Sequence, residues 1–135
     1  MLNSKAKKNI IYIIANLVLI TIISIVYDRM AVTPTAFLFD KLTIYIISIG
    51  LLLFLFGLLT EYEKILEAYK NGFSINKVTF FIAIVMLIIS CLPYGSFIPI
   101  NIKVGVVLNY KIIRYIFSIW SGILVARSLV IKHFQ

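Results

Sequence analysis

An uncharged apolar run near the middle of the chain constrains the fold more than any other feature. Residues 42–60 carry no charge, and about 20 apolar residues are enough for a helix to cross the hydrocarbon core of a bilayer. In residues 61–70, apolar side chains recur at helical spacing while glutamates and lysines occupy the other faces. No glycine or proline separates the two parts, so we expect one helix over 42–70 whose second half stands in water. Asn71-Gly72 is expected to end it.

The composition favours a chain embedded in a membrane. Of the 135 residues, 62% are hydrophobic and 13% are charged, whereas soluble domains average about 45–50% apolar and about 25% charged residues. A single domain of this size, residues 1–135, cannot hide so many apolar side chains from water. We therefore expect an all-α integral membrane protein. The abundance of isoleucine, lysine and asparagine indicates an AT-rich, bacterial source.

Three further apolar runs complete a predicted set of four transmembrane helices in an antiparallel bundle. Lysines precede the first run, as they do in a signal peptide. However, the run exceeds the apolar core of a signal peptide and no clear cleavage site follows, so we expect a retained helix. Ser74 is expected to cap the third helix. The predicted helices cover about 10–27, 42–70, 75–92 and 111–131.

The connection between the third and fourth helices has a different pattern. Apolar and polar side chains alternate from Ile98 to Val106. Alternation with period two predicts an extended segment with one side covered. We expect residues 94–110 to form an extended outer loop over the helix ends, with a short re-entrant piece as the alternative.

The positions of lysine and arginine predict the orientation, because cytoplasmic flanks of membrane helices carry an excess of these residues. With the N-terminus inside, eight of the 13 basic residues are cytoplasmic and five are outside. We therefore expect a multi-pass protein of the cell membrane, with both termini and the charged half of the second helix in the cytoplasm. The cytoplasmic set is Lys5, Lys7, Lys8, Lys64, Lys70, Lys77, Arg127 and Lys132, and the outer set is Arg29, Lys41, Lys103, Lys111 and Arg114.

The inventory of reactive side chains argues against an enzyme. The single histidine, His133, offers no partner for a His-based metal cluster or a catalytic triad. All five acidic residues lie outside the apolar runs, and no Gly-rich phosphate loop occurs. The single cysteine, Cys91, excludes an intramolecular disulfide. We expect no catalytic residue, no metal and no cofactor.

The net charge of +8 has an explanation that does not involve nucleic acid. The basic residues stand at the ends of the apolar runs, where they set orientation and meet anionic headgroups. Membrane lipids are therefore the expected partners.

Two groups of residues are candidates for function. The amphipathic segment after residue 60 offers an apolar face that docks a cytoplasmic partner or, alternatively, an adjacent subunit or the lipid surface. A polar stripe in the last helix is a candidate pore lining or anion site. In the alternative interpretation, its arginine reaches the headgroups and its serines bond their own backbone. The docking face is Tyr62, Ile65, Leu66 and Tyr69, and the stripe is Arg114, Ser118, Ser121 and Ser128.

Small residues at regular spacing predict where helices pack. They let neighbouring backbones approach closely in a bilayer, where van der Waals contact drives helix association. The second helix carries Thr43, Gly50 and Gly57, and the last helix carries Ser118, Gly122 and Ala126.

Two classes of function remain open. In the first, the chain is a small accessory, regulatory or immunity-type subunit that acts by contact with a membrane-protein partner. In the second, it is an oligomeric anion-permeable channel or small transporter, which requires several copies because four helices do not surround a wide water path. We expect the first, since no acidic residue or histidine lies inside an apolar run to couple a proton or cation.

Overall fold

The described residues of the chain are almost entirely helical. The structure is a computed structural model that describes residues 4–32, 39–92 and 111–131. Five helices and two short strands occur there, in the order α1 Ser4–Val32, α2 Phe39–Thr60, α3 Tyr62–Asn71, β1 Phe73–Ile75, α4 Lys77–Cys91, α6 Lys111–Ser128 and β2 Leu129–Ile131. The predicted helical class is confirmed. The predicted outer loop over 94–110 lies outside the described residues.

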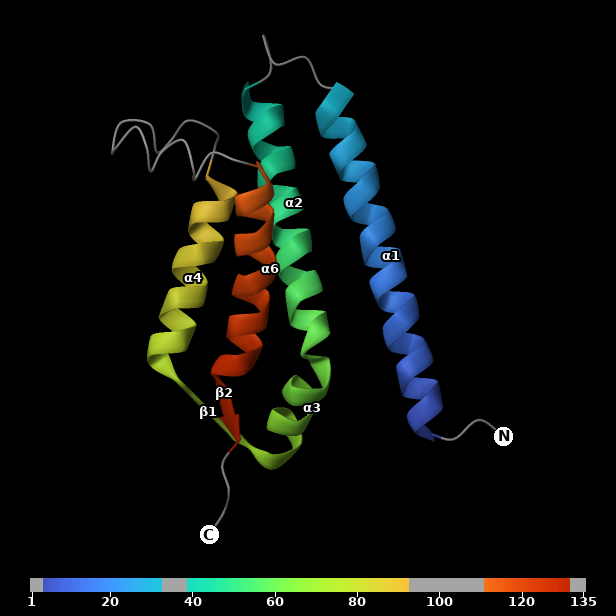
Figure 1. The fold of residues 1–135 in the computed structure, drawn as a ribbon, viewed down its shortest axis with the longest axis vertical. Coiled ribbons are helices and arrows are strands. Elements are labelled where there is room, and N and C mark those ends of the chain that lie inside the picture. The colour runs from blue at the N-terminus through green and yellow to red at the C-terminus, as the bar shows by residue number, and fades with distance from the viewer. Residues whose placement is uncertain (1–3, 33–38, 93–110, 132–135) are drawn as a thin grey trace.

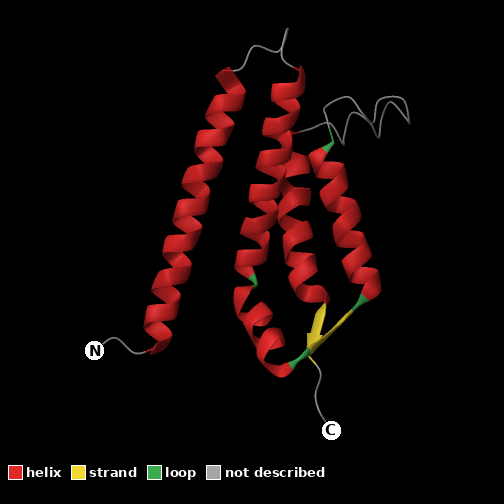
Figure 2. Cartoon of the chain, turned by 180° about the vertical axis from the view of Figure 1, so that it is seen from behind, coloured by secondary structure: helices red, strands yellow, loops and turns green. Residues whose placement is uncertain are grey.

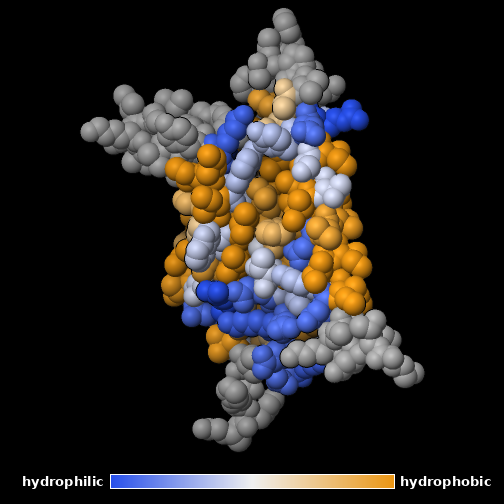
Figure 3. All heavy atoms as spheres, turned by 45° about the vertical axis from the view of Figure 1, so that its right-hand side comes forward, coloured by the Kyte–Doolittle hydropathy of each residue, from blue (hydrophilic) through white to orange (hydrophobic). Residues whose placement is uncertain are grey.

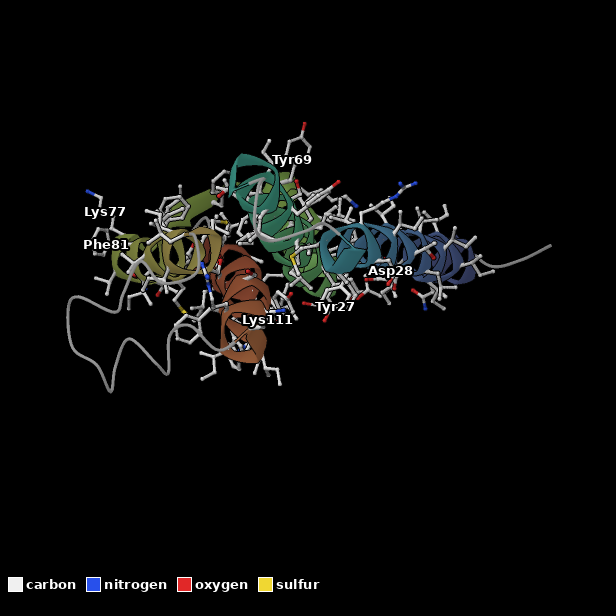
Figure 4. All side chains as sticks on the ribbon, turned by 90° about the horizontal axis from the view of Figure 1, so that it is seen from above. Tyr27, Asp28, Tyr69, Lys77, Phe81 and Lys111 are labelled. Carbon is white, nitrogen blue, oxygen red and sulfur yellow. The ribbon has the colours of Figure 1, made fainter. Side chains whose placement is uncertain are left out.

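Three of the long helices pack mutually and the fourth lies at their edge. α6 contacts both α2 and α4, and α1 packs chiefly against α2. Viewed from above, the helices follow one another across the molecule, with α4 at one side, α6 and α2 between, and α1 at the other side (Figure 4). The chain runs alternately up and down, so α1 and α4 begin where α2 and α6 end (Figure 1). A compact four-helix bundle is not confirmed, because α1 covers only one edge of the other three.

α1 is longer than the predicted helix over 10–27, because it begins at Ser4 and ends at Val32. The apolar run marks the part suited to lipid, whereas helical backbone continues through the charged residues on both sides. Within α1, residues Asn9–Ala31 are long and apolar enough to cross a membrane, as are Leu42–Thr60 of α2.

The predicted continuous helix over 42–70 is interrupted at Glu61, which has φ −110° and ψ 23°. The Thr60 hydroxyl donates to the Gly57 carbonyl at 2.7 Å, the acceptor that an uninterrupted helix would offer to the Glu61 amide. That amide donates instead to the Leu58 carbonyl at 3.2 Å, which tightens the turn. The helix is therefore divided into α2 and α3, and Figure 2 shows the short interruption between them.

A two-stranded antiparallel sheet replaces two predicted helix ends. β1 and β2 pair with Phe73 opposite Ile131 and Ile75 opposite Leu129. The Asn76 amide extends the pairing by donating to the Ser128 carbonyl at 2.8 Å. The prediction that the last helix runs to 131 is therefore wrong. The β-branched residues at 130 and 131 suit a strand once a partner strand lies beside them.

The predicted cap of the third helix is also wrong. Ser74 lies in β1, and Asn76 caps α4 because its Oδ1 accepts from the amides of Val78 and Thr79 at 3.2 and 3.3 Å. On the other side of the strand, α3 ends at Asn71 and Gly72 takes φ 76°. Glycine adopts this value without strain, which lets the chain turn from α3 into β1.

Little of the apolar surface is buried within the chain. A small core between α1 and α2 contains Met30, Ile46 and Ile49. In contrast, many large apolar side chains point outward, such as Val78 on α4 with 70% of its surface exposed. Figure 3 shows apolar residues over the middle of the molecule and hydrophilic residues at its two ends.

Candidate functional site

A close backbone contact between α2 and α6 involves one glycine of each helix. A Cβ placed on Gly57 would overlap the carbonyl oxygen of Ile119 and lie 3.2 Å from the Gly122 Cα. A Cβ on Gly122 would overlap the carbonyl oxygen of Phe54. Backbone therefore lies against backbone, and neither position has room for a side chain. Ser118 and Ala126, one helical turn on either side of Gly122, are fully buried.

The second small residue of α2 lies where three helices meet. A Cβ on Gly50 would be 2.9 Å from the Cys91 Sγ at the end of α4 and 3.6 Å from the Ser118 Oγ of α6. Thr43, near the start of α2, is half-buried. The structure thus brings Gly50, Gly57, Ser118 and Gly122 into one contact region.

Arg114 is buried at the end of α4, with 2% of its surface exposed. Its Nη2 donates to the Ile89 carbonyl at 3.2 Å. Ile89 belongs to the last turn of α4, whose carbonyls have no amide partner within the helix. The guanidinium therefore serves as a cap for α4, at the end where the helix dipole favours a cation. This buried position differs from the predicted alternative in which the side chain reaches the headgroups.

The serines of the polar stripe are enclosed with Arg114. Ser118, Ser121 and Ser128 are fully buried. Ser118 Oγ donates to the Arg114 carbonyl at 3.2 Å, and Ser128 Oγ donates to the Val125 carbonyl at 2.7 Å. Within the described part of the chain, the buried Ser121 Oγ has no hydrogen-bond partner. The stripe faces protein in a single copy of the chain.

The predicted docking face on α3 is divided by the fold. The Tyr62 ring stacks on Tyr12 of α1, with ring centroids 4.9 Å apart and planes at 19°. Ile65 is half-buried, whereas Leu66 is 42% exposed and Tyr69 is 81% exposed. Tyr69 lies at the opposite side of the molecule from Tyr27 and Lys111 (Figure 4). Leu66 and Tyr69 form the part of this face that stays available, and we call them the α3 outer face.

An ion pair that the sequence did not indicate lies at the start of α3. Glu61 Oε1 accepts a hydrogen bond from Arg127 Nε at 2.8 Å, and Arg127 Nη2 forms an ion pair with the same oxygen at 2.8 Å. The pair joins the α2–α3 interruption to the last turn of α6. On its inner side α3 packs against β2 and α6, and Ala68 is fully buried. The only sequence signal was a charged residue at the end of each of two apolar runs, and such residues are common at the ends of membrane spans.

Two adjoining cavities lie between α1 and the α2–α3 region, and they contain further residues that the sequence did not single out. A polar cleft of about 730 Å³ lies near the start of α1 and is lined by residues that include Asn9, Tyr12, Glu63, Lys64 and Glu67. An apolar groove of about 580 Å³ lies further along α1 and is lined by residues that include Val18, Ile22, Leu55, Leu59 and Ile65. Tyr62 lines both. No group of three or more histidine, cysteine, aspartate or glutamate residues suited to a metal ion occurs among the described residues.

No protein-family model, curated protein or solved structure matches this chain. What the chain does is therefore inferred from its own residues.

Proposed function

We propose that the chain is a multi-pass protein of the bacterial cell membrane that acts, without catalysis, by contact with another protein. The two helices of membrane-spanning length and the apolar zone between two hydrophilic ends support a membrane position. Lipid-facing apolar side chains, such as those along α1 and α4, incur no cost in hydrocarbon. The same side chains in water would form an exposed apolar surface of a size that soluble monomers rarely carry.

α4 and α6 supply the third and fourth spans in this proposal. α6 has 18 residues and α4 has 15, so at 1.5 Å per residue α4 is about 22 Å long. This is shorter than the hydrocarbon core of about 30 Å, and a bilayer adapts to a short span by thinning locally. The burial of Arg114 against the Ile89 carbonyl suits a span, because charged side chains inside a membrane face protein and bond backbone carbonyls.

The proposed orientation places the α3 end of the molecule in the cytoplasm. The starts of α1 and α4 and the ends of α2 and α6 lie together at that end (Figure 1). The lysines and arginines near these four points outnumber those at the other end, eight to five. An excess of basic residues is the usual mark of the cytoplasmic side.

The exposure of Tyr69 carries the proposal of function by contact. Tyr69 is 81% exposed on a helix whose inner side is fixed by Ala68 and by the Glu61–Arg127 pair. A helix packed on its inner side that presents aromatic and aliphatic side chains beyond the membrane zone fits the helix-in-groove mode of peptide recognition. We propose that the α3 outer face docks a protein partner, with the chain as its accessory, regulatory or immunity-type subunit.

The channel alternative requires the Arg114 stripe to face water in an oligomer. All four stripe residues are 2% exposed or less within one copy, so conduction through this stripe would require the α2, α4 and α6 contacts to open. Because the stripe is buried inside a single copy of the chain, we prefer the contact function.

The test combines crosslinking in cells with current measurements. A photoreactive residue at position 69 should give one discrete adduct with a different protein, and Leu66→Asp should abolish that adduct while membrane insertion persists. The control carries the photoreactive residue in place of Ile112, which is exposed near the start of α6. This control should not give the adduct. Reconstituted protein should pass no current. Chloride-selective current that Arg114→Glu reduces would establish the channel instead.

A further inference from the structure

The strand β1 has an open edge. β1 and β2 form the sheet by themselves, and α3 packs against β2. Among the described elements, β1 has no contact comparable to the one with β2, and all three of its residues are exposed. The sheet lies at the lower end of the molecule (Figures 1 and 2), where hydrophilic residues gather (Figure 3). β1 therefore offers one side to a further strand.

The register of the sheet determines which backbone groups point to the open edge. The Asn76 amide donates to the Ser128 carbonyl at 2.8 Å, in register with the paired strands. Hydrogen-bonded and non-hydrogen-bonded pairs alternate along antiparallel strands, so Ser74 and Asn76 direct their backbone groups to β2. Phe73 and Ile75 direct theirs to the open edge. Within the described parts of the chain, no backbone hydrogen bond reaches these outward groups.

The side chains at this edge indicate what a further strand would carry. Phe73 and Ile75 lie on the same face of β1 and are 44% and 47% exposed, so alternate apolar side chains of an added strand would contact them. Lys70 and Lys77 are exposed before and after β1, and Lys77 points away from the helices (Figure 4). No acidic residue follows Glu67 in the sequence. Both ends of the edge are therefore positively charged.

We propose that the β1 edge binds an extended segment of a partner protein, which adds a third strand to the sheet and carries acidic residues at its ends. The backbone of this segment exchanges hydrogen bonds with Phe73 and Ile75, the mode of recognition in which a peptide extends a sheet. Its acidic residues lie beside Lys70 and Lys77, where opposite charges attract. We rely here on the proposed function by contact, for which the added strand is the element that the partner supplies.

A second copy of the chain does not fit this edge. The two-fold axis that relates two antiparallel strands is perpendicular to both, and two copies in one bilayer need that axis along the membrane normal. β1 runs obliquely to the long helices (Figures 1 and 2), so two copies paired in this way would be tilted against each other. With Ser74 opposite its counterpart, Lys77 of one copy would also lie near Lys70 of the other, and like charges repel.

Amide hydrogen exchange followed by NMR tests the proposal on the full chain in lipid nanodiscs. The probe is a short synthetic peptide of alternating valine and threonine with a glutamate at each end. We expect it to slow the exchange of the Phe73 and Ile75 amides about fivefold, because they gain hydrogen bonds. The Ser74 and Asn76 amides, which the sheet already protects, should change little. The same peptide with lysine at each end should bind about fivefold more weakly, because two exposed ion pairs are lost.

Proline variants separate the two sides of β1, because proline has no backbone N–H. Ile75→Pro removes an outward donor, which an edge strand tolerates, and should lower the affinity for the glutamate-ended peptide about fivefold with little change in melting temperature. Ile75→Val keeps the donor and is the control for the altered side chain. Ser74→Pro removes a donor to β2 and should lower the melting temperature instead.

Several results would overturn the inference. They are unchanged exchange of the Phe73 and Ile75 amides, equal affinity for the two peptides, and binding that the folded Ile75→Pro variant leaves intact. Protection of the same amides that rises with protein concentration, without peptide, would assign the edge to a second copy instead.

The crosslink at position 69 distinguishes this inference from the proposed docking on α3. If position 69 gives its adduct and the peptide does not bind, only the strand inference fails. If the peptide protects Phe73 and Ile75 but position 69 gives no adduct, docking on the α3 outer face fails and contact through β1 stands.

Discussion

Gly57 of α2 and Gly122 of α6 lie backbone against backbone, so that a Cβ on either one would overlap a carbonyl oxygen of the opposite helix. Helices that approach this closely gain van der Waals contacts along their whole interface, the main source of helix association in lipid. The contact also positions α6 against its neighbours. Two residues of α6 then make contacts outside it: Arg114 bonds the Ile89 carbonyl of α4, and Arg127 pairs with Glu61.

The glycine contact predicts a graded response to added side-chain volume. Gly122→Leu should destabilise the fold by about 1–3 kcal/mol, the usual effect of overpacking, because the obstacle is rigid backbone. Gly50→Ala should have a smaller effect, because its new Cβ meets the Cys91 Sγ, a side-chain atom that can rotate away. Thermal melting in detergent measures both. Equal stability of Gly122→Leu and the unmodified protein would contradict the structure.

Removal of the Arg114 guanidinium should destabilise the packing of α4 on α6. Arg114→Met keeps most of the side-chain volume but leaves the partly buried Ile89 carbonyl without its donor, which costs about 1 kcal/mol. Lys77→Met removes an exposed positive charge at the start of α4, is the matched control and should have little effect. The measurement is again the melting temperature. A rise in stability for Arg114→Met would mean that burial of the charge costs more than the capping contact contributes.

The Glu61–Arg127 pair should show a small but measurable coupling energy. The two side chains are 22% and 55% exposed, so solvent screens the pair and we expect about 0.5 kcal/mol. A double-mutant cycle with Glu61→Gln and Arg127→Gln isolates that energy. Because the pair lies at the start of α3, Arg127→Gln should also lower the yield of the position-69 crosslink. The yields are compared at equal amounts of folded protein. A crosslink of unchanged yield would show that the sheet alone positions α3.

The proposed orientation predicts a labelling pattern on intact cells. In a Cys91→Ser background, cysteines at Ser4, Ser74 and Gln135 should resist an impermeant thiol reagent, whereas a cysteine at Asn101 should react. All four should react once the membrane is permeabilised, which controls for accessibility. Reaction at Ser74 in intact cells would reverse the proposed orientation or remove the second span.

The local pattern of the sequence was enough to predict most helix positions. A run without charge and with apolar residues at helical spacing is a property of neighbouring residues, so α2, α4 and α6 begin and end within about three residues of their predicted bounds, apart from the end of α2. The length and hydropathy of the two longest runs also indicated helices of membrane-spanning length. The alternation of apolar and polar residues failed to reveal β1, because a three-residue strand is too short to show a period.

Tertiary contacts decided the features that carry the candidate site. At the helix break, the Glu61 side chain bonds Arg127, a residue 66 positions later. Leu129–Ile131 forms a strand rather than a last helical turn because β1 offers it backbone hydrogen bonds. Arg114 is buried because Ile89, 25 positions away, presents a carbonyl at the end of α4. In each case the feature involves a partner distant in the sequence, which a local pattern does not reveal.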